Sequence, residues 1–81
     1  MCEALERLIN DDLKPFLKSA CSAFEREGDT LRVAEIEELL QSLNEMVEDI
    51  RNGVMDSWEC GELYEEFKTH RESGDFLDKI S

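Results

Sequence analysis

The chain has 81 residues, and its 21 acidic and 9 basic residues give it a formal net charge of −12. This length allows one small domain with one core, since typical domains run to about 100 to 200 residues. No apolar run approaches the roughly 18 residues that a membrane span needs, and the Met1-Cys2-Glu3 start lacks the basic-then-apolar layout of a signal peptide. We therefore expect a single acidic domain over residues 1–81, located in the cytoplasm.

The spacing of apolar residues predicts an all-α fold. These residues recur at steps of three and four, and no stretch shows the alternating pattern of a β-strand. Short links between the predicted helices favour a small antiparallel bundle of three to five helices with consecutive helices as neighbours. The predicted helices and a final short turn cover residues 2–9, 12–27, 31–52, 57–72 and 76–80.

The first helical region contains Pro15, which lacks the N–H that a helix interior needs but is tolerated in a first turn. Asn10, Asp11 or Asp12 would each cap a helix that begins just before this proline. We therefore predict a break near Asn10, with a separate helix on each side of it. The alternative is one helix with a kink at Pro15.

The helix predicted over 31–52 has the clearest pattern in the chain. Asp29 or Thr30 is a candidate N-cap, and Asn52-Gly53 suits the left-handed turn that closes a helix. At about 1.5 Å per residue this helix would be roughly 33 Å long, and the acids between its apolar residues should point outward. The predicted apolar stripe consists of Leu31, Val33, Ala34, Ile36, Leu39, Leu40, Leu43, Met46, Val47 and Ile50.

A further helix is predicted over 57–72, because Asp56 precedes Glu59 by three residues, as in a capping box. We expect Trp58, at the start of this helix, to lie in the core; the alternative is a binding hot spot, where tryptophan is enriched. The narrower apolar stripe of this helix consists of Cys60, Leu63, Tyr64 and Phe67. In the turn that follows, the apolar side chains either cover the end of the bundle or are exposed contacts for a partner. These residues are Phe76, Leu77 and Ile80.

The three cysteines, Cys2, Cys21 and Cys60, include no pair at the two-residue spacing of zinc or redox motifs. With an odd count and no such pair, we expect no disulfide framework. Cys21 falls among apolar residues at helical spacing, so we expect it to pack as a small buried hydrophobe.

The negative charge is concentrated in the middle of the chain. Residues 33–66 contain eleven acids and one base, Arg51, and so carry −10 of the total of −12. The folded domain should therefore have one strongly negative side. We expect no direct binding to nucleic acid, because such binding requires cations that neutralise phosphates.

Motifs that carry catalysis or bind cofactors are missing from the sequence. It contains one histidine, no Gly-rich phosphate loop, no Gly-x-Ser-x-Gly elbow and no paired metal-ligand spacing. His70 comes late in the last long helix, where a helix C-terminus favours positive charge. We therefore expect neither catalysis, nor a cofactor, nor a bound metal.

Surface binding is the function that this pattern favours. Acids on two neighbouring helices can form one carboxylate-rich face, which either serves solubility alone or docks on a basic surface of a partner. In the second case the chain would be an inhibitor or nucleic-acid mimic that occupies a nucleic-acid-binding protein. In size and charge it is similar to small acidic inhibitors carried by phages and mobile elements. The candidate binding residues are Glu35, Glu38, Glu45, Glu48, Asp49, Trp58, Glu59, Glu62, Glu65 and Glu66.

Two alternatives assign the acidic face mainly to solubility. One is a structural homodimer, because the stripe of the long helix is wider than a two-helix seam needs and oligomerisation commonly supplements small cores. The other is an antitoxin or immunity-type role with a protein partner. The candidate dimer contacts are Ile36, Leu39, Leu43, Met46 and Ile50, with Leu5, Leu8 and Ile9 as further ones.

Overall fold

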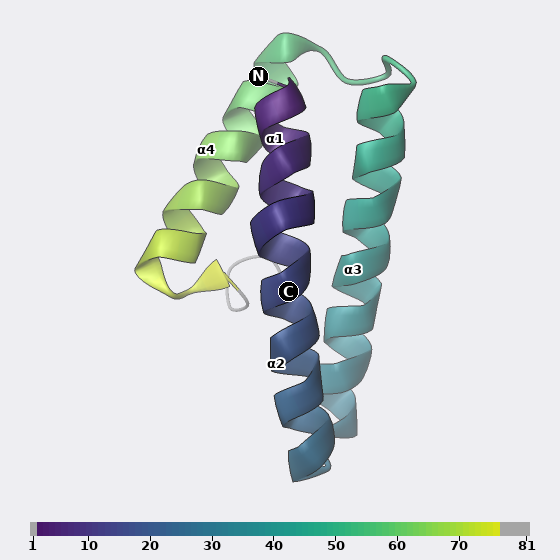
Figure 1. Cartoon of the computed structure of the whole chain (residues 1–81), viewed down its shortest axis with the longest axis vertical. Helices are drawn as coiled ribbons and strands as arrows, with labels where there is room; N and C mark the ends of the chain where they lie inside the picture. Colours follow the sequence, from purple (N-terminus) through teal and green to yellow (C-terminus); the bar gives the residue numbers. More distant parts are fainter. Residues whose placement is uncertain (1, 77–81) are drawn as a thin grey trace.

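One helical rod runs without a break from Cys2 to Glu27 in the computed structural model, which describes residues 2–76 (Figure 1). It consists of α1 (Cys2–Leu8), a five-residue π-helical turn η1 (Ile9–Leu13) and α2 (Lys14–Glu27). The backbone stays in the right-handed helical region at both junctions. The predicted break near Asn10 is therefore wrong, and the region is one helix, as the alternative held, with a π-helical turn before Pro15 where that alternative placed a kink at the proline.

The π-helical turn explains how the rod passes Pro15. In a regular α-helix the proline ring would clash with the carbonyl four residues earlier and leave that carbonyl without its N–H partner. Here the turn directly before Pro15 is widened, and the N–H of Lys14 donates to the carbonyl of Ile9, five residues back. Such turns occur as single π-bulges inside α-helices, and they let a helix absorb a local disruption without ending.

The two later helices begin and end where capping residues stand. In α3 (Thr30–Arg51) the Asp29 side chain accepts from the N–H of Arg32 at 3.2 Å. In α4 (Ser57–Ser73) the Asp56 side chain accepts from the N–H of Glu59 at 2.8 Å. Both N-caps satisfy amides that a helix start leaves unbonded, which confirms the predicted starts of these helices to within a residue.

The first rod and α3 run in opposite directions, and so do α3 and α4, which confirms the predicted all-α antiparallel bundle (Figure 1). α3 packs along α2 as a hairpin, whereas α4 packs on α1. The linker 52–56 carries the chain past the N-terminal end of α1, so α1 lies between α3 and α4 (Figure 1). The expectation that α3 and α4 are neighbours is therefore wrong.

The core forms along the first rod, where one apolar residue per turn is fully buried. Phe76 closes the lower end of α4 and is 1% exposed, with T-shaped contacts to Phe16 and Phe67 at ring-centroid distances of 6.2 and 5.8 Å. Phe76 is therefore part of the core and not an exposed contact for a partner, although it packs beside the start of α2 and not at the end of the bundle, while Leu77 and Ile80 lie outside the described residues. The buried core consists of Leu5, Ile9, Leu13, Leu17, Cys21, Ile36, Leu43, Val47, Cys60, Phe67 and Phe76.

The apolar stripe of α3 faces this core within the same chain. Ile36 and Leu43 are 3% and 2% exposed, and the candidate dimer contacts Leu39, Met46 and Ile50 are half-buried against the core. Leu31 is an exception to the predicted stripe, since it is 71% exposed. At about 100° per residue it stands roughly 140° around the helix from Ile36, so it points away from α2.

Within residues 2–76, no helix combines the length and the apolar character needed to cross a bilayer.

Candidate docking surface on α4

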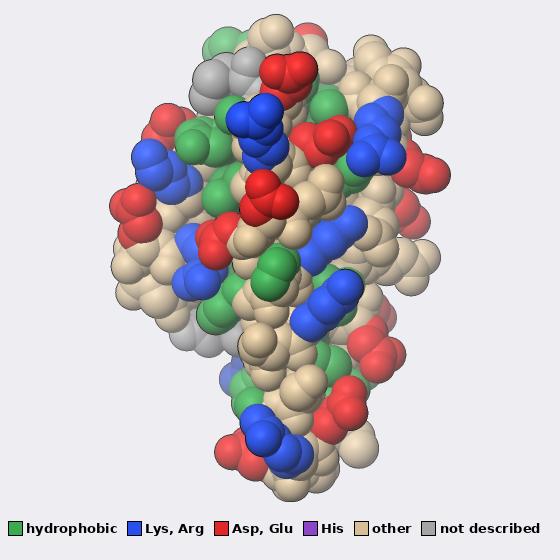
Figure 2. Space-filling view, in the orientation of Figure 1, with side chains coloured by type: hydrophobic (Ala, Val, Ile, Leu, Met, Phe, Trp, Pro, Cys, Tyr) green, Lys and Arg blue, Asp and Glu red, His purple; other side chains and the backbone are tan. Residues whose placement is uncertain are grey.

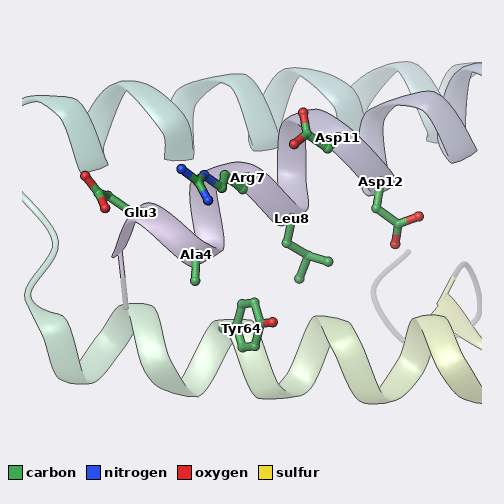
Figure 3. Close-up of a pocket in the computed structure, with 7 residues that line it drawn as sticks. All are labelled: Glu3, Ala4, Arg7, Leu8, Asp11, Asp12 and Tyr64. Atoms are coloured by element: carbon green, nitrogen blue, oxygen red, sulfur yellow. The ribbon is translucent and has the colours of Figure 1, made fainter.

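The inner side of α4 determines which of its residues face outward. Cys60 is fully buried and Phe67 is 6% exposed, and both point toward the first rod. Between them, Tyr64 lies opposite Ala4 and Leu8 of α1 (Figure 3). These contacts fix the rotation of α4 on α1, and they confirm the predicted stripe of this helix.

Trp58 lies on the opposite side of α4 and is 70% exposed, so the expectation that it belongs to the core is wrong. The physical reason is its register, because two residues at about 100° each place it roughly 200° around the helix from buried Cys60. The described chain offers no second layer to cover it there. Trp58 instead borders a shallow, open groove together with Ser57, Gly61, Glu62, Glu65 and Glu66.

Four carboxylates share the outer side of α4 with this indole. At helical spacing they and Trp58 fall within an arc of about 120°, and all of them are exposed. We call this surface the α4 face, and it consists of Trp58, Glu59, Glu62, Glu65 and Glu66.

The acids of the α4 face have no ion-pair partner among residues 2–76. The bridges found there join Arg51 to Glu6, Arg71 to Asp12, His70 to Asp75 and Arg32 to Glu35. Arg51 is the one base within the acidic stretch 33–66, and its Nε lies 3.3 Å from a carboxylate oxygen of Glu6 on α1. The charge of the α4 face is therefore neutralised by none of the described basic side chains.

The α3 candidates form a separate group on the outside of that helix. Glu38, Glu45, Glu48 and Asp49 are exposed, while Glu35 is partly exposed and lies 4.0 Å from Arg32. Because α1 lies between α3 and α4, the ten candidate residues do not line two adjacent helices (Figure 1). In the view of Figure 2, Lys and Arg side chains lie along the middle, interspersed with acids, and further acids lie on both sides.

A second groove lies between α1 and α4 and has a different character (Figure 3). Its rim combines the carboxylates of Glu3, Asp11 and Asp12 with the guanidinium of Arg7, and its floor contains the ring of Tyr64. These groups give the groove a net charge of −2, compared with −4 for the α4 face, so the groove favours a basic ligand less strongly.

His70 takes part in a helix-end contact. Its Nδ1 lies 3.0 Å from a carboxylate oxygen of Asp75, and its carbonyl accepts from the N–H of Gly74 in the closing turn. Within the described part of the chain, no group of three or more His, Cys, Asp or Glu side chains is placed to hold a metal ion.

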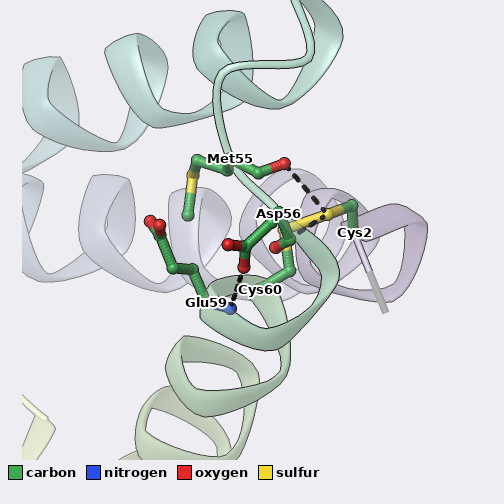
Figure 4. Close-up of a disulfide and its surroundings, with 5 residues drawn as sticks. All are labelled: Cys2, Met55, Asp56, Glu59 and Cys60. Atoms are coloured by element: carbon green, nitrogen blue, oxygen red, sulfur yellow. Dashed lines mark hydrogen bonds between the residues drawn. A yellow bond between two sulfur atoms is a disulfide. The ribbon is translucent and has the colours of Figure 1, made fainter.

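A disulfide joins Cys2 to Cys60, with their Cα atoms 5.0 Å apart (Figure 4). The expectation of no disulfide is therefore wrong. Fifty-eight residues separate the pair, and only the packing of α4 on α1 brings the two helix starts together, so motif spacing gives no signal for it. Closing a loop of this length stabilises a fold by about 4 kcal/mol in the chain-entropy account.

Cys21 is the free cysteine among the described residues, and it is 8% exposed within the core. This confirms its predicted packing as a small hydrophobe. Burial raises the pKa of the Cys21 thiol above its ordinary value, and the nearby carboxylate of Glu25 raises it further. A thiol with a raised pKa is a weak nucleophile at neutral pH.

Comparison with known proteins adds no relative: no protein-family model matches this chain, and no curated protein or solved structure matches it either.

Proposed function

We propose that this protein is a small acidic binding module whose α4 face docks on a basic surface of a partner protein. The observation that carries the proposal is the position of Trp58, 70% exposed and beside carboxylates that have no described ion-pair partner. Protein interfaces commonly combine an aromatic anchor at the centre with a polar rim, and tryptophan is enriched among residues that dominate affinity. The proposed role is binding without catalysis.

Charge density supports a partner that otherwise binds nucleic acid. From Glu59 to Glu66 the helix rises by about 10 Å over seven steps of 1.5 Å and carries four carboxylates, or roughly one charge per 2.6 Å. Double-stranded DNA carries about one charge per 1.7 Å of axis, and one of its strands about one per 3.4 Å. Carboxylates at this density match a surface built for phosphates, so we propose an inhibitor or nucleic-acid mimic, of the kind carried by phages and mobile elements.

The α3 acids offer a second, separate negative flank to the same partner. Glu45, Glu48 and Asp49 stand on the outside of α3 with no described ion-pair partner. A partner that contacts both flanks would have to reach across α1. The α4 face, which also carries an exposed aromatic side chain, is the primary contact in our proposal.

A homodimer through α3 is the second candidate, favoured by the half-buried Leu39, Met46 and Ile50. Fewer residues of the α3 stripe are available for this dimer than the sequence predicts, because Ile36 and Leu43 are already buried within the chain. Sedimentation at micromolar and lower concentrations tests it, and a monomer at every concentration contradicts it. An antitoxin or immunity-type role predicts a tight protein partner too, and a toxin gene next to this one would distinguish it.

The test of the proposed function is a titration with a fluorescein-labelled peptide of nine arginines, a minimal basic surface. Fluorescence anisotropy gives the affinity, and the emission of Trp58, the single tryptophan of the chain, reports whether the α4 face is occupied. We expect binding that shifts the Trp58 emission and weakens steeply with salt, as screened charges do. Binding that ignores ionic strength contradicts the proposal.

A charge-matched pair of variants separates the α4 face from net charge alone. Glu62→Lys with Glu66→Lys reverses two charges on the α4 face, and Glu27→Lys with Glu37→Lys reverses two exposed charges elsewhere. We expect the first variant to lose at least about ten times more affinity than the second, because interface charges act at short range. Equal losses would show that the peptide senses only the overall charge, and the proposed site would be wrong.

A further inference from the structure

The first turn of α4 is attached to α1 through the disulfide. Cys60 is fully buried, and its bond to Cys2 ties this turn to the N-terminal residues of α1 (Figure 4). Upstream of Cys60 the chain has little packing, since Val54 and Trp58 are 67% and 70% exposed and only Met55 is half-buried against the core. Cys60 and its bond to Cys2 are therefore the main attachment of the start of the α4 face.

The remaining attachments of α4 lie downstream of Cys60. Tyr64 packs against α1, Phe67 contacts Phe76, and Arg71 pairs with Asp12 at 3.3 Å. These contacts hold the middle and the end of α4 whether or not the two sulfur atoms are bonded. The disulfide thus holds the other end of the helix, the end that carries Trp58.

We propose that the Cys2–Cys60 disulfide is a redox-sensitive latch that controls the α4 face. This inference rests on the proposed function, and it assigns a regulation to the same surface. In the oxidised state the first turn of α4 is fixed and Trp58 is held in place beside its carboxylates. In the reduced state this turn moves independently of α1, so a partner must order it on binding and the affinity falls.

The reaction that opens the latch is exchange with a dithiol reductant. A thiolate of the reductant attacks Sγ of Cys2, the partly exposed residue of the pair, and the fully buried Cys60 leaves as a thiolate that takes up a proton. The second thiol of the reductant then displaces Cys2, which is protonated in turn. One disulfide is reduced to two thiols, and the dithiol is oxidised to a disulfide by the same two electrons.

The surroundings of Cys2 suit the reduced state as well. Its Sγ lies 3.7 Å from the carbonyl oxygen of Asp56 and 3.9 Å from that of Met55 (Figure 4). A bonded sulfur has no proton to donate, but the Cys2 thiol formed by reduction can donate to either carbonyl. The third cysteine does not compete in the exchange, because Cys21 is buried in α2 and its thiol is a weak nucleophile.

The cytoplasmic location that we expect from the sequence would make such a latch responsive. Glutathione and thioredoxin systems keep most cytoplasmic thiols reduced, and disulfides that form there are mostly transient. A chain in that compartment would open and close the Cys2–Cys60 bond with the local supply of oxidant and reductant.

Hydrogen exchange tests the latch without reference to any partner. The Cys21→Ala variant, which keeps the Cys2–Cys60 pair as its only cysteines, is compared in oxidising buffer and in dithiothreitol. We expect the amides of residues 60–64 to exchange at least about tenfold faster after reduction, while those of residues 43–47 in α3 keep their protection. Equal protection in both states overturns the inference, and so does a loss that includes α3, because the bond would then hold the whole bundle.

A second variant and a binding measurement complete the test. Cys2→Ser leaves Cys60 in the core and cannot close the bond. In oxidising buffer its amides 60–64 should therefore exchange at the rate of the reduced protein, and protection equal to that of the oxidised protein overturns the latch.

The arginine peptide should bind the reduced form at least about threefold more weakly than the oxidised form. Equal affinity overturns the control of binding. If the peptide binds neither form, the proposed function fails, whereas the exchange rates still decide whether the bond holds the first turn.

Discussion

The guanidinium carbon of Arg71 lies 4.0 Å from the centroid of the Phe16 ring, and the same guanidinium reaches a carboxylate oxygen of Asp12 at 3.3 Å. Phe16 in turn contacts Phe76, so a cation, two aromatic rings and an acid close the lower end of α4 against the first rod. Stacking of a guanidinium on an aromatic face is worth about 0.5 to 2 kcal/mol, depending on how far it is removed from water. This contact and the disulfide hold α4 at its two ends.

Substitution of Arg71 by alanine should lower the free energy of unfolding by about 1 to 2 kcal/mol, because it removes the stack on Phe16 and the pair with Asp12. Urea denaturation of the oxidised protein measures the change. Lys68→Ala is the matched control: Lys68 is an exposed residue of the same helix whose ammonium lies 5.9 Å from the ring of Tyr64, and its loss should cost under about 0.5 kcal/mol. An equal loss of unfolding free energy in the two variants would contradict the stabilising role of the Arg71 contacts.

Neutralising part of the α4 face should make the protein more stable. Glu62 and Glu66 are four residues apart on an exposed helix side, where like charges destabilise a helix by tenths of a kcal/mol. We expect Glu62→Gln with Glu66→Gln to raise the melting temperature at low salt, and the gain to shrink in about 1 M salt, where the Debye length is about 3 Å.

The control for this charge neutralisation is Glu27→Gln, since Glu27 has no acid three or four residues before it in α2. A lower melting temperature for the double variant would mean that these carboxylates have stabilising partners, contrary to the unpaired charges of the α4 face.

In the oxidised protein Cys21 should react slowly with iodoacetamide. The thiolate is the reactive form, and burial raises the pKa of this thiol, so the rate should continue to increase with pH beyond about 9, where an exposed thiol levels off. Mass spectrometry after timed quenching follows the modification, and the unfolded protein provides the rate of an accessible thiol. Rapid alkylation of the folded protein near neutral pH would contradict the buried position of Cys21.

The sequence predicted local structure well, because helix signals are local. The caps at Asp29 and Asp56 and the stripe of Cys60, Leu63, Tyr64 and Phe67 are all read from residues within one or two turns of one another. The same stripe also predicts that Trp58 points away from the core, because a residue two places from Cys60 in a helix lies on the opposite side. That geometric signal outweighs the general tendency of tryptophan to be buried.

What the sequence could not provide depends on contacts between distant segments. The Cys2–Cys60 bond and the pair of Arg51 with Glu6 both require α4 and α3 to be placed on either side of α1, which no local pattern specifies. The same placement divides the acids that had been expected on two adjacent helices. The continuity of the first rod depends on the π-helical turn before Pro15, a rare feature for which propensities give no prediction.

The most direct test of the docking surface is Trp58→Ala, measured by the affinity for the labelled arginine peptide and by the melting temperature. Since Trp58 is 70% exposed, we expect unchanged melting and an affinity lowered by about tenfold, equivalent to about 1.4 kcal/mol. Val54→Ala, at an apolar residue that is 67% exposed but lies outside the α4 face, should change neither quantity. Unchanged affinity in Trp58→Ala, or a loss matched by Val54→Ala, would contradict the assignment of the α4 face as the binding surface.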